Sequence, residues 1–156
     1  MSRRARIPLL VACAAIAAMA GGALALAADP GRGYYVLHCA GCHQSDGTGS
    51  ASHEIPNMKG TVGRYLHLPE GRAFLVQVPG TSNSALSDAE IAVLLNWMLP
   101  QFSRAEMPPG FVPYTADEVT RLRKQRLDDV AGTRAAIVTR LASMGYPVEP
   151  PKEQSK

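Results

Sequence analysis

Cys39-Ala40-Gly41-Cys42-His43 is the stretch of this sequence that decides its fold. Residues three positions apart share one face of a helical turn, so the two thiols can bond the same edge of a flat ring system. The histidine that follows can then turn its imidazole towards a metal at the centre of that ring. The pattern therefore predicts a planar metal-containing group, held by two sulfurs and one nitrogen, around which the rest of the chain folds.

Other uses of paired cysteines need features that this sequence does not offer. A structural zinc site needs a second ligand pair at knuckle spacing, and the remaining histidines are scattered singly. A thioredoxin-like redox pair lies near a βαβ pattern, and a disulfide, although ordinary in an exported chain, leaves the adjacent histidine unexplained. Cys-x-x-Cys-His is the attachment signature of c-type haem. We predict one covalent haem c, anchored by Cys39 and Cys42, with His43 as the proximal iron ligand.

The first 28 residues predict export. Three arginines within the first six residues precede an apolar run that ends in small residues near Ala28, which is the layout of a cleaved secretory signal peptide. A run of about twenty apolar residues can also stay in place as a membrane anchor. Leu10-Val11-Ala12-Cys13 resembles a lipoprotein acylation box, but most of the apolar run lies beyond Cys13. We expect cleavage and a periplasmic protein, attached to a membrane only if the segment is retained.

Removing this segment changes the charge of the protein. The full chain has a formal net charge of +3, and the three arginines of the segment account for all of it. A mature protein with equal numbers of basic and acidic side chains gives no basis for nucleic-acid binding.

The remaining chain predicts one mainly helical domain. A short helix over Tyr34–Cys39 leads into the cysteine motif, and residues 53–83, with three prolines, are expected to be mostly irregular. Ser87-Asp88-Ala89-Glu90 is a capping box that opens a helix, which Pro100 is expected to stop.

The last third of the chain predicts two further helices. A second capping box at Thr115–Glu118 opens a helix that Gly132 ends or bends, and its basic cluster is expected to be a solvated face: Arg121, Arg123, Lys124 and Arg126. A third helix covers about Thr133 to Met144. We therefore predict an all-α fold divided into a signal segment (1–28), a haem domain (29–113), a helical extension or closing helix (114–146) and a flexible tail (147–156).

Several segments resemble class I cytochromes c. Gly33-Tyr34-Tyr35 through the cysteine motif, followed by Asp46-Gly47-Thr48-Gly49, is similar to the haem-binding start of that family. Ile55-Pro56-Asn57-Met58-Lys59-Gly60 resembles its Pro-Asn-Leu-x-Gly turn, and the likeness covers roughly residues 31–111. The resemblance implies that the Pro56 carbonyl accepts a hydrogen bond from Nδ1 of His43, which would make Nε2 a better iron donor. It also implies that Met58 takes the leucine position and packs on the haem.

The second axial ligand of the iron is less well defined by the sequence. Electron carriers usually supply a methionine sulfur, and Met107 is predicted because Met107-Pro108-Pro109 resembles the family's Met-Pro loop. In another register, Leu86–Leu99 is the closing helix and the preceding loop reads Val78-Pro79-Gly80 where Met-Pro would belong. That register leaves a five-coordinate iron open to small ligands, or coordination by one of three other side chains: Met58, His53 and His67.

These features predict a one-electron carrier rather than an enzyme. It would accept electrons from a dehydrogenase and pass them to an oxidase or another cytochrome. Two alternatives are a haem subunit of a larger redox complex, docked through residues 114–144, and a five-coordinate haem protein that binds a small ligand. The aromatic residues are expected to form core around the haem: Tyr34, Tyr35, Phe74 and Trp97.

Overall fold

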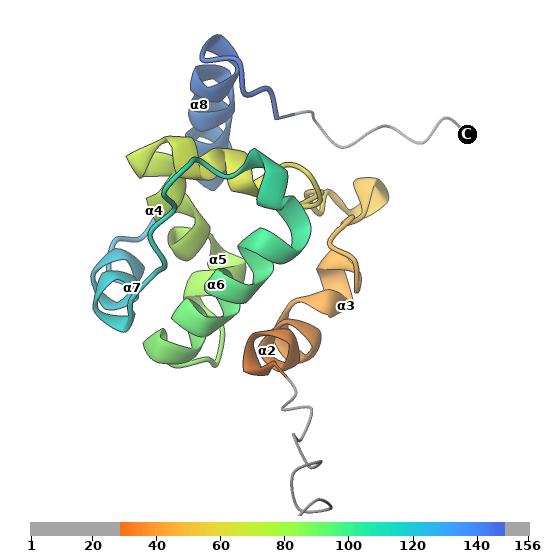
Figure 1. Cartoon of the computed structure of the whole chain (residues 1–156), viewed down its shortest axis with the longest axis vertical. Helices are drawn as coiled ribbons and strands as arrows, with labels where there is room; N and C mark the ends of the chain where they lie inside the picture. The colour runs from red at the N-terminus through yellow and green to blue at the C-terminus, as the bar shows by residue number, and fades with distance from the viewer. Residues whose placement is uncertain (1–28, 149–156) are drawn as a thin grey trace, which may run out of the picture.

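The computed structural model describes residues 29–148 and is all-α (Figure 1), as the sequence predicts. The predicted signal segment and residues 149–156 lie outside the described range. Within residues 29–148, extended pairing is limited to one bridge between Ser50 and Ile55. The first half of the chain forms α2 (Pro30–His38), α3 (Ala40–His43), η1 (Ala51–His53), η2 (Val62–His67), α4 (Pro69–Gln77) and α5 (Pro79–Ser82). The second half forms α6 (Asp88–Ser103), η3 (Arg104–Glu106), α7 (Ala116–Arg123) and α8 (Val130–Ser143).

Helix α2 packs against α6, which runs through the middle of the molecule in Figure 1. Gly31 permits the contact, because a Cβ atom at this position would lie 2.3 Å from Cβ of Trp97. One turn further on, the Tyr35 ring packs against Trp97 and Phe102, with centroid distances of 5.6 and 4.9 Å. Asp29 caps α2 by accepting a hydrogen bond from the Gly31 N–H, as short polar side chains do at helix starts.

Helix α6 begins as predicted but runs further. The Ser87 hydroxyl accepts from the Glu90 N–H and the Glu90 carboxylate accepts from the Ser87 N–H, so the capping box is complete. The prediction that Pro100 stops the helix is wrong, since α6 continues to Ser103. A proline inside a helix removes one backbone bond, and the residue before it, Leu99, is fully buried.

The prediction that residues 53–83 are mostly irregular is also wrong. This region contains η2, α4 and α5. Pro69 and Pro79 are the first residues of α4 and α5, where the missing N–H has no helical partner in any case. Phe74 on α4 is buried and stacks against Tyr65 of η2, with ring centroids 5.8 Å apart.

The predicted long helix after Thr115 is divided in two. Helix α7 ends at Arg123, and α8 begins after Asp129, whose carboxylate accepts from the Gly132 N–H at 2.8 Å. Gly132 therefore lies in the first turn of α8 and does not end a helix. The third predicted helix is confirmed in type, and it starts three residues earlier than expected.

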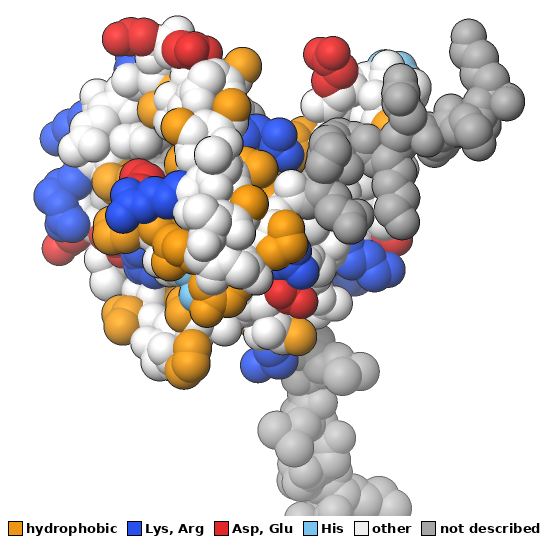
Figure 2. Space-filling model, turned by 90° about the horizontal axis from the view of Figure 1, so that it is seen from above, with side chains coloured by type: hydrophobic (Ala, Val, Ile, Leu, Met, Phe, Trp, Pro, Cys, Tyr) orange, Lys and Arg blue, Asp and Glu red, His pale blue; other side chains and the backbone are white. Residues whose placement is uncertain are grey.

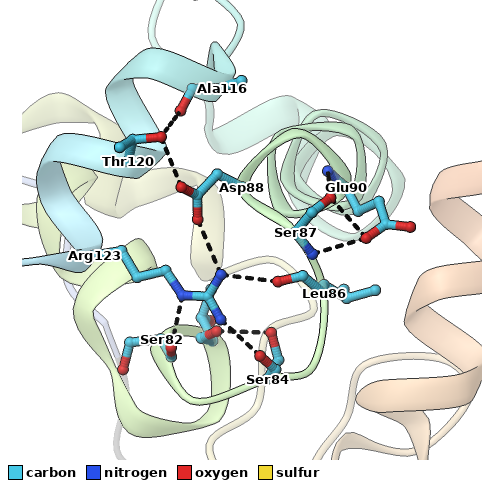
Figure 3. A network of polar contacts seen from close by, with 10 residues as sticks. Ser82, Ser84, Leu86, Ser87, Asp88, Glu90, Ala116, Thr120 and Arg123 are labelled. Carbon is cyan, nitrogen blue, oxygen red and sulfur yellow. Dashed lines mark hydrogen bonds and ion pairs between the residues drawn. The ribbon is translucent and has the colours of Figure 1, made fainter.

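Arg123 contradicts the prediction that the basic cluster of α7 is a solvated face. Its guanidinium donates to the carbonyl oxygens of Ser82, Ser84 and Leu86 and to Asp88 Oδ1, at distances of 2.6 to 2.9 Å (Figure 3). Its side chain is 23% exposed. Planar guanidinium groups suit such multiple acceptor sites.

The C-terminal part of the described chain packs back onto η2. The Tyr146 ring stacks on His67 with centroids 3.8 Å apart, and the Pro147 carbonyl accepts a hydrogen bond from Arg64. Val148 is buried. The first two residues of the predicted tail are thus packed against the domain, and no helix within residues 29–148 combines the length and the apolar character needed to cross a membrane.

Candidate haem-binding site

The two cysteines lie at the junction of α2 and α3, on the helical turn that the sequence predicts. The Cys39 N–H donates to the Tyr35 carbonyl and the His43 N–H donates to the Cys39 carbonyl, both at 2.9 Å. Both cysteines are free thiols, Cys39 half-buried and Cys42 exposed. Burial raises the pKa of the Cys39 thiol, and the nearby Cys42 adds to the shift. Both sulfurs are thus available for covalent attachment of a shared group.

The His43 imidazole is oriented by a backbone carbonyl. Its Nδ1 lies 3.3 Å from the Pro56 oxygen, and a carbonyl can only accept, so Nδ1 carries the proton of this contact. Burial lowers the pKa of His43, and the hydrogen bond to Pro56 partly offsets that effect. Near neutral pH the ring is therefore uncharged, and the lone pair of Nε2 is free to bind a metal.

Gly49 brings the Pro56 carbonyl to this position, a role that the sequence analysis missed. Its φ is +70°, and a Cβ atom there would lie 2.4 Å from the Ile55 oxygen and 2.5 Å from the Pro56 oxygen. Only glycine fits such a close approach at positive φ. The Gly49 N–H also donates to the His43 carbonyl at 3.0 Å, so the turn closes directly onto the cysteine motif.

Tyr35 is a core residue that also holds the chain in place directly after the cysteine motif. Its hydroxyl donates to the Gln44 carbonyl at 2.6 Å, and the residue is 1% exposed. Burial raises the pKa of Tyr35 to about 12, with smaller contributions from the charges of Cys39 and Asp46. The hydroxyl therefore stays protonated and keeps donating throughout the physiological range.

Met107, the predicted ligand, and Met58, an alternative, lie in different surroundings. Met58 is 9% exposed, and its N–H donates to the Gly47 carbonyl at 2.8 Å. Met107 is half-buried and covers Gly63, where a Cβ atom would lie 3.0 Å from Cγ of Met107. Met98 is buried within α6.

The other histidines have neighbours of their own. Nδ1 of His53 lies 3.0 Å from the Ser50 hydroxyl on an exposed turn, and Nε2 of His67 donates to the Glu106 carbonyl at 2.9 Å. His38 is exposed next to Cys39.

The donor set suits a c-type haem. Two free thiols on one turn match the two attachment points of the macrocycle, and an uncharged imidazole follows them with Nε2 free. Within the described residues, no group of three or more His, Cys, Asp or Glu side chains offers an alternative metal site. The chemistry of these residues therefore fits an iron porphyrin better than a bare ion.

This fold and this donor set define a small all-α haem protein of the c type. The family model described as "Cytochrome c" matches residues 28–101. A cytochrome c-552 of Thermus thermophilus is 35% identical over 124 residues, covering 68% of this chain and 82% of that protein. A second cytochrome c-552 of Thermus thermophilus is 34% identical over 107 residues, covering 57% and 81%. The chain belongs to the cytochrome c family, as a class I c-type cytochrome.

The family match covers only part of the described helices. The match ends at Gln101, inside α6. Met107, α7 and α8 follow the matched residues.

Proposed function

We propose that this protein is a periplasmic mono-haem cytochrome that carries single electrons between a dehydrogenase and an oxidase or another cytochrome. One observation carries this proposal: His43, which directly follows the free Cys-x-x-Cys pair, has its Nδ1 in contact with the Pro56 oxygen. The sequence holds one such motif, which supports one haem per chain. The predicted signal segment supports export to the periplasm.

Each residue of the site has a distinct part. Cys39 and Cys42 would form the two thioether bonds, and His43 would bind iron through Nε2. The bound haem supplies the one-electron chemistry of its iron. The Pro56 carbonyl keeps the imidazole oriented, and Met107 is the ligand that the sequence predicts for the second axial position.

The surface is consistent with brief encounters between redox partners. On the face shown in Figure 2, basic and acidic side chains are interspersed with hydrophobic ones and do not form a patch of one sign. This face carries no large field of one sign and therefore offers little electrostatic steering. The donor and acceptor would therefore meet the protein through short-range contacts near the haem edge.

Expression of the full chain in a host with c-type haem maturation tests the proposal. We expect a red protein that keeps its haem in acidified organic solvent, has lost the N-terminal segment by mass, and cycles reversibly between the oxidised and reduced forms. The Cys39→Ala/Cys42→Ala variant should lose covalent haem. Colourless protein, or haem extracted from the parent chain, would refute the proposal.

A further inference from the structure

Different segments of the chain contact the two ends of helix α6, so the helix can be used to locate the parts of the haem site. The Gly60 N–H donates to the Phe102 carbonyl at 2.8 Å, and a Cβ atom at Gly47 would lie 3.0 Å from the Phe102 ring. The turn that contains Pro56 is therefore fixed at the C-terminal end of α6. The N-terminal end of this sixteen-residue helix lies about 24 Å away.

The contact with Pro56 fixes the direction of the His43 ring. Its Nδ1 faces the Pro56 oxygen, so Nε2, on the opposite side of the ring, points away from the C-terminal end of α6. An iron bound to Nε2 has its second axial position on the far side again. The segment that enters the N-terminal end of α6 is the connection 78–87, which follows α4.

The connection 78–87 offers no strong ligand for haem iron. It reads Val-Pro-Gly-Thr-Ser-Asn-Ser-Ala-Leu-Ser, without the methionine or histidine that usually completes the coordination of an electron carrier. Met58 follows Pro56 in the turn at the C-terminal end of α6, and Met107 covers Gly63 beyond that same end. Neither methionine lies beside the connection.

Arg123 holds the connection in a fixed conformation (Figure 3). Its Nε donates to the Ser82 carbonyl at 2.7 Å, Nη2 to the Ser84 carbonyl at 2.6 Å and Nη1 to the Leu86 carbonyl at 2.8 Å. Asp88 at the start of α6 balances the charge, with Oδ1 2.9 Å from Nη1. Moving the connection would take three carbonyl acceptors away from the half-buried guanidinium and leave it only Asp88, which is energetically unfavourable.

We infer that the second axial position of the iron faces the connection 78–87 without a protein ligand, binds small π-acceptor molecules such as carbon monoxide, and is kept at a fixed opening by Arg123. The inference rests on the haem attachment proposed above. It replaces Met107 as the expected occupant of that position, and it does not depend on which partners exchange electrons with the haem.

Absorption spectra of the purified holoprotein test the open position. We expect a high-spin ferrous spectrum that shifts on titration with carbon monoxide, with the same result in the Met107→Leu variant. A low-spin ferrous spectrum that carbon monoxide leaves unchanged would overturn the inference, as would conversion to a carbon monoxide-reactive form only after Met107→Leu. A pyridine haemochrome assay on the same sample reports covalent haem separately, so failure of attachment is distinguished from failure of the open position.

The rate of carbon monoxide binding after flash photolysis tests the role of Arg123. Arg123→Gln removes most of the donors and should raise the association rate several-fold. Arg121→Gln is the matched control, because Arg121 is exposed on the same helix and, among residues 29–148, its side chain donates only to the Asp117 carbonyl, at 3.5 Å. Arg123→Lys, which keeps the charge beside Asp88, should give an intermediate rate and serves if Arg123→Gln does not fold. Folded variants with the rate of the parent chain would refute the role of Arg123.

Discussion

The guanidinium of Arg72 meets the carboxylate of Glu118 at two points, with Nε 2.6 Å from Oε1 and Nη2 2.7 Å from Oε2. The pair joins α4 to α7, and its side chains are 21% and 20% exposed. Arg72 also lies over the Tyr114 ring, 3.9 Å from the centroid. The hydrogen bond from Arg72 is the main reason why the pKa of Glu118 is held below its usual value.

Glu118→Gln should lower the free energy of unfolding by about 2 kcal/mol at pH 7, since a charged hydrogen bond is lost. The pKa of Glu118 is lowered in the folded state, so its contribution is present above the unfolded pKa and is lost as pH falls through the folded pKa. The difference between variant and parent should therefore shrink below about pH 4. Urea unfolding at several pH values measures it, with Asp117→Asn as an exposed control. A difference that does not depend on pH would contradict this account.

Tyr114→Phe should destabilise the fold by about 1 kcal/mol. The Tyr114 hydroxyl donates to the Arg72 carbonyl at 2.8 Å, and the residue is 3% exposed. Removing the hydroxyl leaves that carbonyl without this donor in a dry environment. Tyr146→Phe is the control, since Tyr146 is only half-buried. Thermal unfolding measures both variants, and equal small effects would argue against the importance of the hydrogen bond.

Gly31→Ala should destabilise the domain by roughly 1 to 3 kcal/mol, because overpacking separates two helices. The new Cβ would lie 2.3 Å from Cβ of Trp97, whereas a Cβ at Gly33, on the same helix, meets nothing within 4 Å. Gly33→Ala should therefore be neutral or stabilising by about 0.5 kcal/mol. Denaturant unfolding compares the two variants. The same sign for both would show that helix propensity, and not the crossing of α2 and α6, controls the result.

Gly49→Ala should raise the midpoint potential of the haem by an amount on the order of tens of millivolts. The new Cβ would displace the Pro56 carbonyl from His43 Nδ1, and a weaker imidazole donor stabilises the ferric iron less. Gly60→Ala is the matched control, since Gly60 has a similar φ of +69° but nothing within 4 Å of its Cβ position. Spectroelectrochemical titration measures both. Equal potentials in the two variants would contradict this account, because they would attribute the shift to backbone strain and not to the orientation of His43.

The local signals in the sequence predicted the cysteine turn, the contact between His43 and Pro56, and the start of α6. Each depends on residues close together in the chain or on the family resemblance. The prolines were harder to interpret, since this residue type can begin a helix or lie within one: Pro69 and Pro79 start helices, and Pro100 lies inside one. Which of these occurs depends on burial of the neighbouring residues.

The role of Arg123 was not predictable from its neighbours in sequence. Four basic residues within six positions are typical of a solvated face, and the acceptors of Arg123 lie more than thirty residues earlier in the chain. Only the packing of α7 against the start of α6 brings them together. The end of α7 was missed for a related reason, because Asp129 acts as an N-cap only when the preceding helix has stopped.

The bonds from α7 to α4 and α6 predict that the autonomous folding unit is longer than residues 28–101, the region that the family model matches. A protein cut after residue 113 would leave Arg72 and Asp88 half-buried without their charge partners, and the Asn96 side chain would lose both hydrogen bonds to the Tyr114 backbone. Cleavage or truncation within the segment 102–115 should therefore yield an aggregation-prone fragment and not a minimal cytochrome.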